Sequence, residues 1–235
     1  MKKIECSDVV KKYGGKAAVD KVTVTLETGK IYAMVGPNGS GKTTWMKMVS
    51  GLVKADSGEI KYDGEKIGTK SKKEIAYMST EPYFYSWMKV IDAGRYYDDF
   101  FDDFSIDKYE ELLIAMNIER EDKIKSLSTG MIAKMKIALT MARDAYIYLL
   151  DEPLNGIDLI AREQIIKTII EAADENKAII VSSHLIDELE KLCDCALFMH
   201  DGRMIEIWDV EEKRTECGKS VTDRYREIYG MGGML

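Results

Sequence analysis

The stretch IYAMVGPNGSGKTT, at residues 31–44, decides the fold of this chain. Its first part, Ile31 to Val35, is an uninterrupted apolar run, which is typical of a central strand covered on both faces. The next part matches the pattern G-x-x-x-x-G-K-[ST], in which glycines let successive backbone N–H groups point into one concavity. We expect a helix to follow from about Lys42 to Leu52, and the N-terminus of a helix favours anionic phosphates. Strand, loop and helix together predict a phosphate-binding loop (P-loop) for ATP.

The residues of this loop are suited to phosphate chemistry. Lys42 can reach the β- and γ-phosphates, so we expect it to act in both binding and catalysis, and the Thr43 hydroxyl can ligate Mg²⁺. A glycine-rich turn that matches the pattern by chance is the alternative, but the strand before it and the helix after it disfavour that interpretation. The candidate nucleotide-binding residues of the loop are Gly36, Pro37, Asn38, Gly39, Ser40, Gly41, Lys42, Thr43 and Thr44.

A second apolar strand, Tyr146 to Leu150, ends in the carboxylates Asp151 and Glu152. Beside a P-loop, Asp151 can bind the Mg²⁺ shell through water, and Glu152 can polarise the attacking water. The alternative is a strand that ends in solvated acids at the surface. We expect ATP and Mg²⁺ as the two cofactors and Glu152 as a catalytic residue.

Composition restricts the class of protein. The chain has 235 residues, 46% of them apolar, which suits one compact α/β unit with an attached subdomain. With a formal charge of −7, the chain lacks the positive electrostatic field of a nucleic-acid binder, so we expect no nucleic-acid partner. The four cysteines form no C-x-x-C pair, which predicts free thiols in a reducing compartment. Neither a signal peptide nor a run of 18 apolar residues is visible, so we expect a cytoplasmic chain that docks on a membrane protein.

The pattern of elements predicts three zones along the chain. Residues 1 to about 75 read as strands around one helix, and Asp63-Gly64 is typical of a hairpin turn. Residues from about 80 to 143 look helical and are rich in aromatic and acidic side chains. The third zone resumes strand–helix alternation, with a strand from Ala178 to Ser182, which implies a parallel sheet. We expect residues 230–235 to fray.

Further motifs resemble the ATP-binding cassette (ABC) family, the nucleotide-binding domains of ABC transporters. SLSTGM at residues 126–131 is similar to the family signature L-S-G-G-Q, and LNGID at residues 154–158 is similar to its D-loop. His184 follows a strand where the family has its switch histidine, and Tyr13 has the spacing of the aromatic residue that stacks on adenine. The resemblance covers roughly residues 1–210, followed by a short C-terminal tail at 211–235.

The resemblance implies a fold and further site residues. The fold would be α/β, a P-loop NTPase core with a parallel sheet, an N-terminal antiparallel β subdomain and an inserted α-helical signature subdomain. Ser128 and Gly130 would face the γ-phosphate held by a second subunit, in a homodimer or heterodimer. Ser128 also heads a helix, where its hydroxyl could simply be an N-cap. His184 would act in catalysis, and Tyr13 would stack on adenine or merely pack.

Two motifs depart from the family pattern: the signature, which reads L-S-T-G-M instead of L-S-G-G-Q, and the Q-loop. Thr129 replaces a glycine of the signature, which adds a β-branched side chain at the start of the helix. Thr80 stands where the family usually has the Q-loop glutamine, and Glu81 follows it. A threonine side chain is too short to reach Mg²⁺ as the glutamine of the family does. The contact with Mg²⁺ would therefore be water-mediated through Thr80 or supplied by Glu81.

The resemblance implies the ATP-hydrolysing subunit of a membrane ABC transporter, at the inner face of the cell membrane beside a transmembrane permease. The short tail and the variant motifs look more like exporters of drugs, peptides or antimicrobials than importers. The aromatic and acidic stretch from Tyr83 to Phe104 would receive a helix of the permease. A soluble ABC ATPase of translation or DNA repair is the alternative, although such proteins usually have two cassettes or a long coiled-coil insertion. A nucleotide sensor that has lost hydrolysis is a third.

Overall fold

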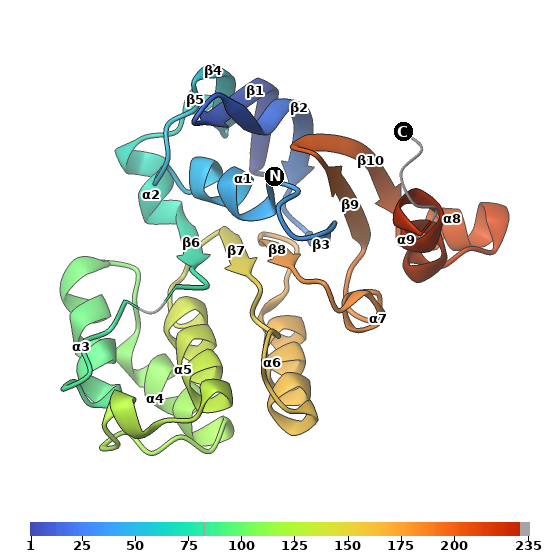
Figure 1. Cartoon of the computed structure of the whole chain (residues 1–235). Coiled ribbons are helices and arrows are strands. Elements are labelled where there is room, and N and C mark those ends of the chain that lie inside the picture. Colours follow the sequence, from blue (N-terminus) through green and yellow to red (C-terminus); the bar gives the residue numbers. More distant parts are fainter. Residues whose placement is uncertain (82, 231–235) are drawn as a thin grey trace.

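The larger of two sheets lies at the centre of the molecule (Figure 1). The structure is a computed structural model, and it describes residues 1–81 and 83–230. Within those residues the sheet has six strands, in the order β10-β9-β3-β8-β7-β6. Strands β9, β3, β8, β7 and β6 pair in parallel, and the edge strand β10 is antiparallel to β9. The predicted parallel sheet is therefore confirmed, with one antiparallel edge. Its strands are β3 Lys30–Val35, β6 Ile75–Met78, β7 Ile147–Asp151, β8 Ala178–Ser182, β9 Cys195–His200 and β10 Arg203–Asp209.

The predicted antiparallel β subdomain is a second sheet, at the top of Figure 1, with the order β2-β1-β4-β5. The predicted hairpin joins β4 to β5, with Tyr62 paired to Glu65. Its turn residues Asp63 and Gly64 have φ angles of 51° and 78°, as a two-residue turn with both centres left-handed requires. The strands of this sheet are β1 Lys3–Tyr13, β2 Lys16–Glu27, β4 Ser57–Tyr62 and β5 Glu65–Lys66.

Strand β3 is buried on both faces, as its apolar run predicted. Tyr32 and Met34 point into a core shared with α1 (Lys42–Val49) and the antiparallel sheet. Ala33 and Val35 point into the opposite core, which contains residues of the helical segment. Because both faces are packed, the carboxyl end of β3 is held rigidly, and the P-loop starts from that end.

Helix α1 ends three residues earlier than the predicted boundary at Leu52. Ser50 is its C-cap, and Gly51 takes a left-handed φ of 74°, which turns the chain out of the helix. A short helix α2 (Thr69–Glu74) then leads into β6. The helices after β7 and β8 are α6 (Leu159–Ala172) and α7 (Ile186–Leu189).

The predicted helical segment lies between β6 and β7, on the side away from the antiparallel sheet in Figure 1. It comprises α3 (Val90–Phe100), α4 (Ile106–Ala115), the 3₁₀ turn η1 (Ile124–Ser126) and α5 (Thr129–Met141).

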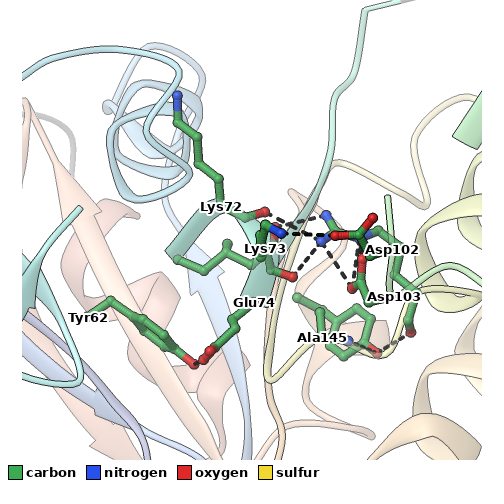
Figure 2. Close-up of polar contacts among 10 residues, drawn as sticks. Tyr62, Lys72, Lys73, Glu74, Asp102, Asp103 and Ala145 are labelled. Atoms are coloured by element: carbon green, nitrogen blue, oxygen red, sulfur yellow. Dashed lines mark hydrogen bonds and ion pairs between the residues drawn. The ribbon is translucent and has the colours of Figure 1, made fainter. Parts of the chain in front are cut away.

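The Arg143 guanidinium fastens this segment to the main sheet. It bonds both oxygens of Asp103 at 3.1 Å and donates to the carbonyls of Ile75 and Lys73, at 3.1 and 2.8 Å. Figure 2 shows Lys73 beside Asp102 and Asp103 at this junction. Arg143 is 3% exposed, so this connection is shielded from solvent.

The residues after β10 form two helices, α8 (Val210–Cys217) and α9 (Val221–Tyr229). Helix α9 packs back on the larger sheet, since Val221 is buried and the Tyr229 hydroxyl donates to the Met199 carbonyl at 2.8 Å. Of the stretch expected to fray, residues 231–235 lie outside the described residues.

All four cysteines are free thiols, as predicted. In the described ranges 1–81 and 83–230, none of the helices combines the length and the apolar character needed to cross a membrane.

Candidate functional site

Two glycines of the P-loop are required by close backbone contacts. A Cβ at Gly36 would lie 2.2 Å from the Met199 carbonyl oxygen, and one at Gly41 would lie 2.3 Å from the Ala18 carbonyl oxygen. Gly41 also has a left-handed φ of 105°. Both positions exclude any side chain, so the loop can wrap tightly at the carboxyl end of β3.

Lys42 is the first residue of α1 and curls back over the loop. Its ammonium donates to the carbonyls of Gly36 and Pro37, at 2.7 and 3.2 Å. Burial lowers the pKa of Lys42, while the carboxylates of Glu152 and Asp151 oppose that shift. The ammonium therefore lies where phosphate oxygens would approach the loop, beside the two acidic residues that the sequence singled out.

Asp151 is the centre of a hydroxyl network at the end of β7. It is fully buried and accepts hydrogen bonds from Thr43 Oγ1 at 3.0 Å and Ser182 Oγ at 2.8 Å, both on Oδ1. The Tyr77 hydroxyl approaches the other oxygen, Oδ2, at 3.3 Å. Hydroxyl donors stabilise a carboxylate that is cut off from water. The structure thus brings together the Thr43 and Asp151 side chains, the two predicted to lie near Mg²⁺.

Glu152 takes an unusual backbone conformation, with a left-handed φ of 49°. Its N–H donates to the carbonyl and hydroxyl oxygens of Ser182, at 3.1 and 3.0 Å, which holds this conformation in place. Its carboxylate Oε2 lies 3.1 Å from Nδ1 of His184. The predicted base and the predicted switch histidine are therefore in contact.

Of the side chains described so far, Lys42, Thr43 and Glu152 line a cavity of about 340 Å³ in front of the P-loop. Its lining comes from β2, the loop, α1 and the segment after β7, and comprises Ala18, Asn38, Gly39, Ser40, Gly41, Lys42, Thr43, Thr44, Glu152 and Asn155. The Ser40 hydroxyl is buried and finds no partner within the described residues, which leaves a polar group available to a ligand.

The donor set suits a metal that shares its ligands with a bound phosphate. No group of three or more His, Cys, Asp or Glu side chains that could hold a metal occurs in residues 1–81 and 83–230. Thr43 and Asp151 instead offer one hydroxyl and one carboxylate, and Mg²⁺ is commonly held by few protein oxygens plus phosphate and water. The residues present therefore fit Mg²⁺ that arrives with a nucleotide.

Comparison with protein families agrees with a nucleotide-binding site at the P-loop. The family model described as "ABC transporter" matches residues 19–155, which is more than half of the chain. The chain belongs to the ABC transporter family. It is the ATP-binding, ATP-hydrolysing cassette of such a transporter, the part that powers transport.

Individual relatives agree with this assignment, and a solved structure shares the fold. The ABC transporter ATP-binding protein YtrB of Bacillus subtilis is 30% identical over 219 residues, covering 91% of this chain and 74% of the relative. The lantibiotic transport ATP-binding protein SrtF of Streptococcus pyogenes is 30% identical over 204 residues, covering 86% of this chain and 89% of the relative. A solved ATP-binding subunit of an ABC transporter superposes with a TM-score of 0.84 at 24% identity, covering 96% of this chain and 98% of the other.

The predicted signature of this ABC ATPase lies outside the cavity. Ser128 is the N-cap of α5, and its hydroxyl accepts a hydrogen bond from the Met131 N–H at 3.2 Å. Gly130 packs against the D-loop, where an added Cβ would meet Asp158 Oδ2 at 3.6 Å. Asp158 in turn caps α6 by accepting from the Ala161 N–H at 2.9 Å. Signature and D-loop are therefore neighbours within one chain, but neither signature residue lines its own P-loop cavity.

Tyr13 and the two Q-loop candidates also lie outside the cavity lining. Tyr13 is at the end of β1, with its side chain half exposed and the Lys11 ammonium 5.5 Å from its ring centre. Thr80 is exposed. The Glu81 carboxylate pairs with Lys47 at 2.9 Å, and that pairing lowers the pKa of Glu81.

Sequence reasoning missed several residues of the site. Tyr77 and Ser182 both donate to Asp151, and Ala18 lines the cavity, as does Asn155 of the predicted D-loop, which had been given no place at the P-loop. A polar residue ending the apolar strand β8 was a usable signal for Ser182, because the carboxyl ends of parallel strands meet at one edge of a sheet. Ala18 had no signal, since it contributes through a strand of the other sheet.

Proposed function

We propose that this ABC ATPase powers an exporter of drugs, peptides or antimicrobials, and that it works at the inner face of the cell membrane on a transmembrane permease. The relative SrtF is named for lantibiotic transport, which supports a peptide-like antimicrobial as cargo. The assignment to export is independent of the ATPase chemistry, since the permease selects what is transported.

The contact of Glu152 Oε2 with His184 Nδ1 at 3.1 Å, beside the P-loop, is the observation that supports hydrolysis by this chain. Glu152 orients and polarises the attacking water, and His184 holds the Glu152 carboxylate in place. Lys42 is positioned to bind the β- and γ-phosphates as charge moves onto the leaving group. Tyr13 stacks on adenine at the open side of the site.

Thr43 and Asp151, which lie 3.0 Å apart, would hold Mg²⁺, with Asp151 acting through water, and Thr80 or Glu81 would complete the contact. Bound Mg²⁺ would neutralise phosphate charge during transfer. Asp151 keeps its orientation because Ser182 and Tyr77 donate to it.

Two copies, identical or of two related chains, pair head to tail around ATP. Ser128 and Gly130 lie outside the cavity of their own chain, and an N-terminus of a helix such as α5 is suited to an anion. In the pair, the signature of one copy would cover the γ-phosphate bound by the P-loop of the other.

The permease docks beside the helical segment. A cavity of about 270 Å³ lies between β6 and this segment, with Leu52, Tyr97 and Phe101 in its lining. Tyr96 and Phe100, next to it on α3, are 50% and 67% exposed. Exposed aromatic side chains next to a hollow are typical of a surface that receives a helix of a partner.

Substitution of Glu152 tests this proposal. Glu152→Gln removes the carboxylate but keeps its shape, so ATP hydrolysis should fall by about 100-fold or more while ATP binding remains. An ATP-stable dimer of this variant should appear on size exclusion. Glu163→Gln, an exposed glutamate on α6, is the matched control and should behave as the unmodified protein. If ATP never promotes dimerisation of the Glu152→Gln variant, the head-to-tail pairing is wrong.

A further inference from the structure

Lys136 is a buried cation to which the mechanism above gives no role. It lies on α5, about two turns after Ser128, and is 5% exposed. Lysine ammonium groups have three hydrogen-bond donors and are rarely buried without partners. A buried lysine on the signature helix therefore needs a physical explanation.

The Lys136 ammonium points to the turn that follows β6. Within the described part of the chain it meets one acceptor, the Glu81 carbonyl, at 3.5 Å, and lies 5.7 Å from the ring centre of Tyr83. Burial lowers the pKa of Lys136, and the carboxylates of Asp151 and Glu81 oppose that shift. Both carboxylates thus favour the charged form of Lys136, against the effect of burial.

Residues 79–81 form the turn after β6 (the 79–81 turn), and a residue of α1 holds this turn from a second side. Lys47 of α1 binds the Glu81 carboxylate at 2.9 Å, and the Glu81 N–H donates to Ser79 Oγ at 3.1 Å. The P-loop helix therefore holds Glu81 through its side chain, whereas the signature helix holds it through its main chain.

The 79–81 turn is also linked to Asp151, through Tyr77. Tyr77, whose hydroxyl is 3.3 Å from Asp151 Oδ2, lies on β6 two residues before the turn begins. A displacement of the turn would move the end of β6 and with it the Tyr77 hydroxyl. The path from α5 to Asp151 thus runs through Lys136, the 79–81 turn and Tyr77.

We propose that Lys136 is a positioning residue that clamps the 79–81 turn to the signature helix, so that movement of α5 is transmitted to Asp151. The contact uses the Glu81 main chain, so it does not depend on the Glu81 carboxylate. The kinetic part of this inference rests on the proposed function; the structural clamp does not.

Hydrogen exchange of the nucleotide-free protein tests the clamp directly. In Lys136→Met, amide exchange in the peptide containing residues 79–81 should accelerate by about tenfold, because a contact to a charged group has been removed. Lys134→Met is the matched control: Lys134 lies on the same helix, but its ammonium binds the Met116 carbonyl and Gln164 Oε1, at 2.9 and 2.8 Å. Exchange at residues 79–81 should be unchanged in that control.

Steady-state ATPase kinetics provide the second measurement. Lys136→Met should lower kcat by about tenfold and change KM for ATP by less than about twofold, whereas Lys136→Arg should recover most of the loss. Lys47→Met removes the exposed ion pair to the Glu81 carboxylate but leaves the Glu81 carbonyl and carboxylate in place, so both parameters should stay within about twofold.

Unchanged exchange at residues 79–81 in Lys136→Met, or equal acceleration in Lys134→Met, would overturn the clamp. A larger kinetic loss in Lys47→Met than in Lys136→Met would also overturn it, because the contact to the Glu81 carboxylate would then matter more than the contact to its main chain. If Lys136→Met does not fold, Lys136→Gln is measured in the same way. If the unmodified protein hydrolyses no ATP but exchange at residues 79–81 is still faster in Lys136→Met, the proposed function is wrong and the clamp stands.

Discussion

Ser182 connects the two carboxylates of the site, and its removal gives the most informative prediction. Its hydroxyl donates to Asp151 Oδ1 at 2.8 Å and accepts from the Glu152 N–H at 3.0 Å. Ser182 is fully buried, so water does not readily replace the hydroxyl. Ser182→Ala deletes both hydrogen bonds without changing the backbone.

The expected loss follows from the partners that remain. Asp151 keeps the Thr43 and Tyr77 hydroxyls, and the Glu152 N–H keeps the Ser182 carbonyl at 3.1 Å. The dominant loss is one hydrogen bond to a buried charged group, which destabilises the folded state by about 2 kcal/mol. For a chain of this size, that loss lowers Tm by about 4–8 °C.

Activity should fall with stability, because Glu152 depends on Ser182 for its strained backbone conformation. We expect kcat of Ser182→Ala to fall by about tenfold, which corresponds to about 1.4 kcal/mol of transition-state stabilisation. Urea unfolding measures the stability change, and an ATPase assay well below Tm measures kcat.

Ser183→Ala is the matched control for this prediction. Ser183 is also fully buried, but its hydroxyl accepts a hydrogen bond from the Leu185 N–H at 3.1 Å and touches neither carboxylate. Its loss should cost about 1 kcal/mol and leave kcat within about twofold. The reasoning is refuted if the two variants lose equal stability and equal activity.

Two further substitutions test the P-loop and the helical segment. Gly36→Ala places a Cβ 2.2 Å from the Met199 carbonyl oxygen, so ATP affinity measured by calorimetry should weaken by about 100-fold, or about 2.8 kcal/mol; unchanged affinity would show that the loop adapts. Arg143→Met leaves Asp103 without its guanidinium partner, so the free energy of unfolding in urea should fall by about 3 kcal/mol. A loss below about 1 kcal/mol would mean that the junction in Figure 2 is not held by Arg143.

The sequence predicted the elements of the fold well because their signals are local. The apolar run before the P-loop, the Asp63-Gly64 turn and the strand Ala178–Ser182 all lie where they were expected. The end of α1 was predicted three residues too late, because the boundary depends on the left-handed conformation of Gly51 rather than on hydrophobic periodicity.

The candidate site was predictable only in part. Lys42, Thr43 and Asp151 were found because P-loop chemistry restricts residue type and spacing, and the structure brings them together. Tyr77 and Lys136 were not found, because each acts through a contact with a residue more than fifty positions away. Neither residue type is unusual in its own segment, so no local pattern distinguishes them.

By itself, the sequence determined that this chain has a P-loop followed at a distance by paired carboxylates, since backbone conformation and phosphate charge allow few residues at those positions. Tertiary structure alone decided which hydroxyls surround Asp151, how Glu152 meets His184, and where the charge of Lys136 is placed. The reason is physical: hydrogen bonds between strands and helices depend on sheet order and helix packing, and these bring together residues that are distant along the chain.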